Sequence, residues 1–284
     1  MFQQAGYAVR DACQALGISR SAYYAAQKTR VTRVRRNPEA DNVLVVLMKQ
    51  IKDAHIFWGY RRVWAWLRFR LDVVVNQKRV RRLMKEHGLM VLRRIHKAKR
   101  TPQRSKPRPS RPGQIWGMDM TKFIIDGLGW VYLVIVLDWY TKKIVGWDMA
   151  LRSKTAEWRR ALDMAINREF PNGVRGQGLN LVSDNGSRPT SVAFMRATGE
   201  LGINQIFTSY NNPKGNADTE RVIQTIKQEL IWVNEFKGYE EAREKFEQWV
   251  ARDYNQLYLY KKLGYRSPEE FEAWYNQESA RKAG

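Results

Sequence analysis

Apolar residues recur at helical spacing through the amino-terminal part of the chain. Residues 7–28 break at Gly17 and restart after Ser19, a residue type that commonly caps helices. This outline predicts a helix-turn-helix unit whose second helix carries Arg20 and Tyr23 where they can contact DNA. The first helix is expected to turn one apolar face inward, formed by Val9, Ala12, Cys13 and Leu16.

Three further helices are predicted at residues 40–54, at residues 55–71, and from an Asn76 N-cap to Gly88. Their expected buried positions include Val63, Trp64, Leu67, Leu71, Val80, Leu83 and Met84. The last helix also has a face of almost one sign, made of Lys78, Arg79, Arg81, Arg82 and Lys85. A charged face is usually just solvated, but like charges repel one another, and phosphates as partners explain this face better.

Beyond residue 112 the apolar pattern changes to that of strands. Residues 114–125, 130–141 and 142–152 are rich in Val, Ile, Trp and Tyr and predict three antiparallel strands. The pattern continues with a helix at 155–170, a strand at 178–184, a short helix at 191–202, a strand at 204–209 and a long helix from near Asp218. This order of elements predicts an α/β domain with a mixed sheet.

The distribution of charge separates the same two parts of the chain. Residues 1–112 hold 27 Lys and Arg against 6 Asp and Glu, whereas the rest of the chain is nearly neutral. Residues 92–112 carry nine basic residues, four prolines and no acid, which is typical of an extended basic linker. We therefore predict helical units at 1–36 and 37–91, a linker at 92–112, the α/β domain at 113–236 and a helical extension at 237–284.

Cysteine and histidine usage excludes some classes of protein. The single cysteine, Cys13, cannot form an internal disulfide, and three histidines beside it do not supply a zinc-finger ligand set. No run reaches the roughly 18 apolar residues that a membrane span needs. We expect a cytoplasmic, nucleoid-associated protein that binds double-stranded DNA and no membrane.

Three acids carry the candidate chemistry. Asp119 lies within the first predicted strand, Asp184 ends the fourth, and Glu220 lies in the first turn of the last long helix. Asp184 taken alone is more often a turn former or a cap. If strands one and four are neighbours, however, the three carboxylates converge, and their repulsion favours a bound Mg²⁺ or Mn²⁺. Two such ions can support in-line displacement at a phosphodiester.

The motifs around these acids are WGMDMT, LVSDNGS and KGNADTERVIQTIKQEL, with 35 residues between Asp184 and Glu220. They resemble the DDE signature of retroviral-integrase-like transposases, and most closely the insertion sequence three family, from Gln114 to Trp274. The resemblance implies a ribonuclease-H-like catalytic core preceded by small all-α helix-turn-helix domains. It also implies two metal ions held by the three acids, and a basic residue at Lys227 that holds the transposon end.

The activity implied by this resemblance is nicking at transposon ends followed by attack of the freed 3′-hydroxyl on another phosphodiester, by a copy-out route. No covalent enzyme intermediate is needed. A homodimer or larger assembly on DNA is expected, because two ends must be brought together. The helix after Gly238 is a candidate for such contacts, although packing on its own domain is the simpler interpretation.

The sequence departs from the family in several places. It lacks the residues of the retroviral zinc domain, Arg188 and Pro189 replace a common Gln-Phe pair, and Tyr258 and Tyr260 replace an arginine and a histidine. Family members also often gain a helix-turn-helix and a zipper from a first reading frame. An upstream segment of that kind is therefore a further possible requirement for activity.

The remaining candidates are assigned from residue type alone. In the linker, the predicted DNA contacts are Arg93, Arg94, Lys97, Lys99, Arg100, Arg104 and Lys106. Asn185, Lys214 and Asn216 either position DNA or simply form turns, and Asp138 at the end of a strand is interpreted as structural. Two other functions stay open: a ribonuclease-H-like nuclease or resolvase that cuts without joining, and an inactive DNA-binding repressor.

Overall fold

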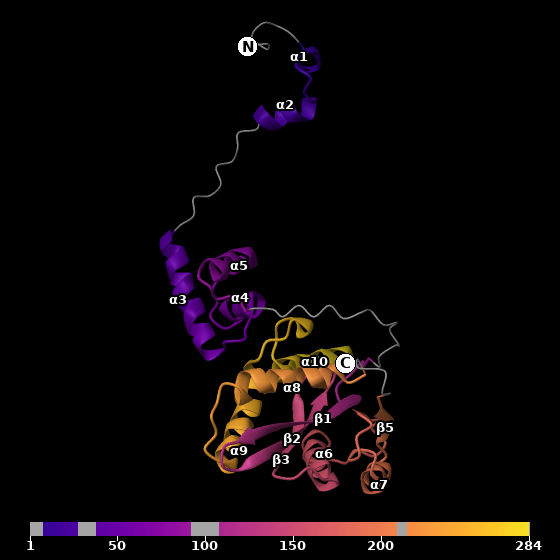
Figure 1. Ribbon diagram of the computed structural model, residues 1–284. Helices are drawn as coiled ribbons and strands as arrows, with labels where there is room; N and C mark the ends of the chain where they lie inside the picture. The colour runs from indigo at the N-terminus through magenta and orange to yellow at the C-terminus, as the bar shows by residue number, and fades with distance from the viewer. Residues whose placement is uncertain (1–7, 28–37, 92–107, 209–214, 284) are drawn as a thin grey trace. The chain divides into compact units, whose positions relative to one another are not determined.

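A computed structural model describes residues 8–27, 38–91, 108–208 and 215–283 of the chain (Figure 1). The chain divides into two compact units, Met1–Leu47 and Met48–Gly284. That division falls inside a helix, so the domain boundaries expected from the sequence remain predictions. In the described parts of the chain, no helix has both the length and the apolar character that crossing a bilayer requires.

The first unit contains the two short helices predicted at its start, α1 (Val9–Ala15) and α2 (Arg20–Gln27). Gly17 adopts a φ of +63° between them, and the Ser19 hydroxyl accepts a hydrogen bond of 3.1 Å from the Ala22 amide. Cys13 is buried as expected. Leu16 is not, because it is the C-cap after α1 and its side chain is 54% exposed.

Helix α3 (Pro38–Ala54) continues into the second unit, where α4 (Tyr60–Phe69) packs against α5 (Gln77–Glu86). The predicted Asn76 cap is confirmed, since its side chain accepts from the Lys78 amide at 2.8 Å. The predicted buried residues Val63, Leu67, Val80, Leu83 and Met84 are all buried. Leu71 is exposed because α4 ends two residues earlier, and Trp64 is only half-buried because its indole donates to the Val75 carbonyl.

The predicted mixed sheet is confirmed. It consists of β1 (Ile115–Ile125), β2 (Gly129–Asp138), β3 (Ile144–Ala150), β4 (Asn180–Ser183) and β5 (Asn204–Phe207), in the order β3-β2-β1-β4-β5. The first three strands are antiparallel neighbours, while β4 pairs in parallel with both β1 and β5. Strands one and four are therefore adjacent, as the convergence of Asp119 and Asp184 requires.

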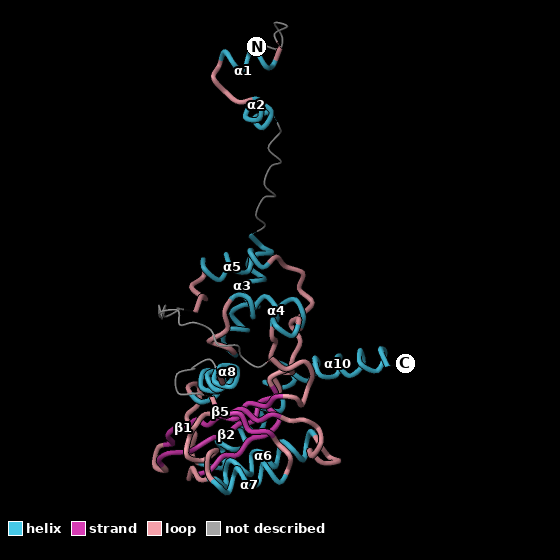
Figure 2. Tube along the Cα trace, turned by 90° about the vertical axis from the view of Figure 1, so that its right-hand side faces the viewer, coloured by secondary structure: helices cyan, strands magenta, loops and turns pink. Residues whose placement is uncertain are grey.

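Helices cover both faces of this sheet. Figures 1 and 2 show α6 (Thr155–Glu169) and α7 (Val192–Glu200) on one face and α8 (Ala217–Ile226) on the other. The apolar side chains of α6 form the core with inward residues of β1 and β2, such as Trp116 and Met118. The predicted inward positions of α6 are all buried: Trp158, Ala161, Leu162, Ala165 and Ile166.

The carboxy-terminal part of the chain packs back on the same domain. Helix α8 continues as a π-helical turn, η1 (Lys227–Ile231), and α9 (Tyr239–Gln248) continues as η2 (Trp249–Leu257). A short 3-10 turn, η3 (Lys261–Leu263), leads to α10 (Pro268–Ala283). Phe246 of α9 contacts Trp147 of β3, with ring centroids 5.0 Å apart. The simpler interpretation of the helix after Gly238 is thus confirmed.

Candidate active site

Strand β1 presents Asp119 on the sheet face opposite α6. Side chains alternate along a strand, and Trp116 and Met118 point into the core beneath α6. Gly117 and Asp119 consequently face the side that α8 covers. The predicted opposition between Asp119 and its methionine neighbours is confirmed, and it places one carboxylate at a covered but polar position.

A glycine on β1 allows α8 to approach. A Cβ at Gly117 would lie 2.1 Å from the Thr219 hydroxyl and 2.2 Å from the Trp139 indole nitrogen, distances that no packed structure tolerates. The Trp139 indole donates to the Thr219 hydroxyl at 3.0 Å. Together these residues fix the first turn of α8, and hence Glu220, beside β1. Sequence reasoning missed them, although a glycine two positions before an acid on one strand face is a usable signal.

Asp184 follows β4 directly and is exposed. One of its carboxylate oxygens accepts from the Gly186 amide at 3.1 Å, so Asp184 also has the turn role that such residues often have. Asn185 donates to the Thr208 carbonyl at 2.8 Å, which ties this loop to the end of β5. The loop that carries the second acid is therefore held at the end of both parallel strands.

The three acids share one electrostatic environment. The pKa of Asp119 is raised to about 7, chiefly because burial penalises its charged form, against a hydrogen bond from the Met120 amide. The negative charges of Asp184 and Glu220 raise that pKa further, and the positive charge of Lys227 lowers it. Among the described residues, no group of three or more His, Cys, Asp or Glu side chains is arranged to hold a metal ion. The charges of Asp184 and Glu220 are thus close enough to act on Asp119.

The last acid and the lysine lie on one helical run. Glu220 is in the first turn of α8, where the helix dipole favours a negative charge, and it is exposed. Lys227 is half-buried at the start of η1. The two therefore occupy opposite ends of the helical segment that faces Asp119.

Asp138, in contrast, is fully engaged within the protein. Its carboxylate accepts from the Gly113, Tyr140 and Thr141 amides and from the Trp116 indole, at distances between 2.7 and 3.2 Å. Burial raises its pKa, and these hydrogen bonds oppose that rise. The side chain ties the start of β1 to the end of β2, which is the structural role expected of it.

Comparisons with known proteins agree with this arrangement. Residues 109–213 and 201–268 match integrase core domain families, and residues 39–98 match an HTH-like domain. An insertion element IS476 protein of Xanthomonas euvesicatoria is 30% identical over all of this chain and 78% of its own length. The transposase for insertion sequence element IS629 of Shigella sonnei is 28% identical over 95% of this chain and 93% of its own.

The chain belongs to the insertion sequence three family of DDE transposases. Its enzyme class is thus that of the DDE polynucleotidyl transferases, with a ribonuclease-H-like core. Among solved structures, the catalytic core domain of BIV integrase is 16% identical, covering 59% of this chain and 99% of that one, with a TM-score of 0.45.

The predicted DNA contacts of this transposase occupy different environments. Arg20 and Lys78 are exposed, Tyr23 and Arg79 are half-buried, and Arg82 pairs with Glu86 at 2.7 Å. Some predicted contacts lie outside the described residues: Arg93, Arg94, Lys97, Lys99, Arg100, Arg104, Lys106 and Lys214.

The asparagine at the start of α8 lies inside the domain rather than on its surface. Asn216 is buried, and its amide donates to the Met118 carbonyl at 3.3 Å. Its side chain thereby ties the first turn of α8 to β1. Its predicted contact with DNA stays a prediction.

The family departures have local explanations. Arg188 donates to the Ser153 carbonyl at 3.1 Å, and the Pro189 carbonyl accepts from Gln205, so the unusual pair still anchors its loop. The Tyr258 ring receives the Arg62 guanidinium at 4.2 Å, and the Tyr260 hydroxyl lies 2.9 Å from that of Tyr254. Aromatic rings here pack around an arginine supplied by α4.

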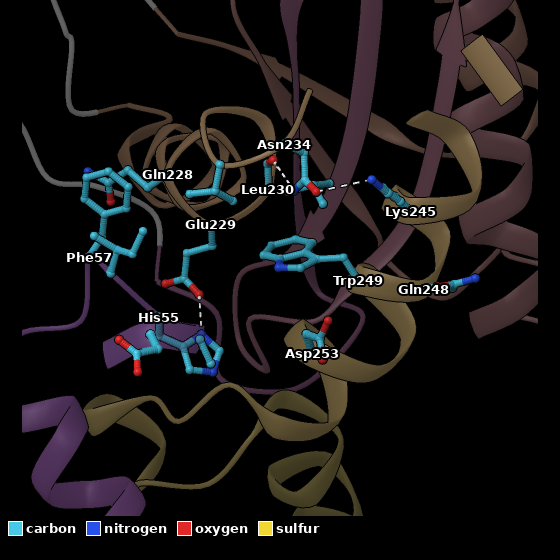
Figure 3. Close-up of a pocket in the computed structure, with 14 residues that line it drawn as sticks. His55, Phe57, Gln228, Glu229, Leu230, Asn234, Lys245, Gln248, Trp249 and Asp253 are labelled. Carbon is cyan, nitrogen blue, oxygen red and sulfur yellow. Dashed lines mark hydrogen bonds and ion pairs between the residues drawn. The ribbon is translucent and has the colours of Figure 1, made fainter. Parts of the chain in front are cut away.

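A buried acid that sequence reasoning missed joins this arginine to the catalytic helix. The Glu229 side chain is only 6% exposed. It accepts from the Trp58 indole at 2.8 Å and from Arg62 at 3.4 Å, and lies 3.6 Å from His55. Figure 3 shows Glu229 pointing at His55 beside a cavity of about 460 Å³. Glu229 therefore anchors α4 and the segment before it to η1, immediately after Lys227.

Proposed function

We propose that this transposase nicks DNA at the ends of its element and joins each freed 3′-hydroxyl to another phosphodiester. Asp119, Asp184 and Glu220 act as the ligands of two divalent cations. The observation that carries the proposal is geometric: Asp184 follows the strand that neighbours the strand of Asp119, and Gly117 lets the first turn of α8, with Glu220, approach β1. The pKa of Asp119, raised to about 7 by burial and by the charges of the other two acids, supports it. A carboxylate held at that pKa beside two like charges is a poor structural element and a good cation ligand.

The donor set fits Mg²⁺ or Mn²⁺. All three side chains offer carboxylate oxygens, and no histidine or cysteine lies in the three motifs. When bound, such ions activate the attacking oxygen and stabilise the leaving one. Asp184 and Glu220 are both exposed, so solvent and DNA can reach these two carboxylates.

The remaining roles belong to basic residues. Lys227, close enough to lower the pKa of Asp119, would hold the transposon end at the site. The basic face of α5 would bind flanking backbone through Lys78, Arg79 and Arg82, and Arg20 with Tyr23 would contact DNA from the first unit. Two ends are joined in the copy-out route, so the active form is a homodimer or a larger assembly on DNA.

A strand-transfer assay tests this function. A duplex that carries one end of the encoding element, pre-cut to expose its 3′-hydroxyl, is incubated with Mg²⁺ and a second duplex. We expect joined product from the wild type and none from Asp119→Asn, Asp184→Asn or Glu220→Gln, while all three variants still bind the duplex. Asp126→Asn, at an exposed acid in the turn after β1, is the matched control and stays active.

Two outcomes would contradict the proposal. Cleavage without any joined product from the wild type would indicate a nuclease or resolvase instead. Activity that persists in any of the three variants would remove that acid from the metal site.

A further inference from the structure

A second cavity, distinct from the one in Figure 3, borders the catalytic helix. It is a groove of about 330 Å³ between α4 and the helical run of α8 and η1. Phe57 and Gln228, labelled in Figure 3, line both cavities. The polar residues of the groove include Tyr60, Arg61, Arg62, Arg221, Gln224 and Gln228. Of the described residues that line it, none is acidic; Arg62 forms an ion pair with Glu229, and the guanidinium groups of Arg61 and Arg221 give the groove a positive potential.

The groove lies along the same exposed face of α8 that carries Glu220, one of the three proposed catalytic acids. Val222, Ile223 and Ile226 are buried, whereas Glu220 and Gln224 are exposed. From Glu220 to Gln224 and Gln228 the helix rises about 6 and 12 Å, at 1.5 Å per residue. A DNA strand advances about 3.4 Å per nucleotide, so this span corresponds to roughly two to four nucleotides.

One wall of the groove is fixed in place by the Glu229 anchor. The Arg62 guanidinium lies 3.4 Å from Glu229 and 4.2 Å above the Tyr258 ring, so it is held before any ligand arrives. Preorganised donors bind phosphate at lower entropic cost than free surface lysines do. The groove is thus a built feature of the fold rather than a chance gathering of long side chains.

The α4 wall also joins the groove to the basic face of α5. The Arg61 and Arg81 guanidinium groups lie 5.5 and 5.6 Å from the centre of the Tyr60 ring. Arg81 belongs to the basic face of α5, so the Tyr60 ring is contacted both by a residue of that face and by Arg61 of the groove. An extended row of basic side chains suits a nucleic-acid strand with many phosphates. A small anion would need only one of these positions.

We propose that this groove binds backbone phosphates of the DNA strand that enters the active site, about two to four nucleotides from the phosphodiester held at the acids. The inference rests on the proposed function, because it takes the acids as the site of reaction. It assigns DNA contact to Arg61 and Arg221, to which the sequence analysis gave no role. Arg62 supports the groove and is also engaged with Glu229.

The test measures how salt weakens DNA binding by the full chain. Each phosphate contact contributes about 0.9 to the slope of log affinity against log salt. A double variant, Arg61→Ala with Arg221→Ala, should therefore lose about 1.8 from that slope. Between 50 and 200 mM salt, the wild type should then lose about twelvefold more affinity than the variant. Two duplexes serve as probes, one with the end of the element and one of mixed sequence, and both should respond alike.

Matched controls separate a local contact from loss of net charge. Arg159→Ala with Arg196→Ala removes the same charge from α6 and α7, on the opposite face of the sheet, and should leave the slope almost unchanged. Replacing Arg61 and Arg221 with lysine keeps the charge and should restore the slope. Circular dichroism melting shows whether each variant is folded.

Two results would overturn the groove. The first is that the folded Arg61→Ala, Arg221→Ala variant shows the same salt dependence of DNA affinity as the Arg159→Ala, Arg196→Ala control. The second is an effect confined to one of the two duplexes, since backbone phosphates are common to both. Either result can occur while the wild type still performs strand transfer, so failure of the groove is distinguishable from failure of the proposed function.

Discussion

Two carboxylates on neighbouring strands, Asp138 buried and Asp119 half-buried, have opposite surroundings. Asp138 is 3% exposed and accepts hydrogen bonds from three backbone amides and an indole. Asp119 accepts from the Met120 amide and otherwise faces the charges of two acids and one lysine. Burial raises the pKa of both. Burial alone therefore does not distinguish the two carboxylates, whereas the like charges around Asp119 do.

The largest expected difference between the two carboxylates is in catalysis. Asp119→Asn removes a cation ligand, and metal ions contribute several kcal/mol of transition-state stabilisation, so strand transfer should fall about a thousandfold or more. Asp138→Asn should leave the rate per folded molecule within about threefold of the wild type. Single-turnover strand transfer, corrected for the folded fraction, measures both. An equal loss of strand-transfer rate in Asp119→Asn and Asp138→Asn would contradict the different roles assigned to these two carboxylates.

A pH titration of stability should distinguish Asp119 next. In the unfolded chain its pKa is the ordinary 3.8, and in the metal-free fold it is about 7. Below 3.8 both states are protonated, and above about 7 both are ionised. Between these values only the unfolded state releases the proton, so the free energy of unfolding falls as pH rises.

From pH 5 to pH 8 this loss amounts to about 3 kcal/mol, at 1.36 kcal/mol per pKa unit. Urea denaturation in the presence of a chelator should show this fall in the free energy of unfolding for the wild type. The Asp119→Asn variant should not show it. Adding Mg²⁺ at pH 8 should return stability to the wild type alone. A pH dependence unchanged by Asp119→Asn would locate the titration elsewhere.

The structural carboxylate should show its effect in stability. Asp138→Asn replaces one acceptor oxygen by an amide that faces donors, which should lower the free energy of unfolding by about 2 to 3 kcal/mol. Asp126→Asn, at an exposed turn, should change it by less than about 0.5 kcal/mol. Denaturation midpoints at pH 8 compare them. If Asp138→Asn proved as stable as the control, the hydrogen-bond network would not carry the role assigned to it.

A smaller effect should follow from closing the space between β1 and α8. Gly117→Ala puts a Cβ onto Thr219 and Trp139, so α8 must shift, at a cost of about 1 to 3 kcal/mol and a measurable loss of strand transfer. Gly199→Ala is the matched control: its Cβ meets nothing within 4 Å, and it lies within α7. That control should be neutral or slightly stabilising, by up to about 1 kcal/mol.

Much of the fold follows from local patterns in the sequence. The Val, Ile, Trp and Tyr content of β1 to β3 and the apolar face of α6 predicted their elements because each depends only on near neighbours in the chain. The ends of helices were harder to predict: Leu16 and Leu71 keep the helical spacing but lie after the last helical residues, Ala15 and Phe69. Their exposure depends on where the helix ends, which spacing does not encode.

Residues of the candidate site likewise fall into those that the sequence predicted and those that it did not. The three acids and Lys227 were found through motifs, because their spacing along the chain is diagnostic. Gly117, Trp139 and Glu229 were not found, because their roles come from contacts between residues far apart in sequence, such as the 171-residue separation of Trp58 and Glu229. Apolar contacts and single buried acids of this kind leave no periodic trace. Packing around a site is therefore harder to predict than its chemistry.

The most direct test of the shared cation site is Mn²⁺ binding to the full chain with an end duplex bound, followed by electron paramagnetic resonance. Asp119→Asn, Asp184→Asn and Glu220→Gln are each expected to weaken that binding strongly, and Asp138→Asn is expected to leave it intact. Undiminished Mn²⁺ binding in any of the first three variants would contradict the account.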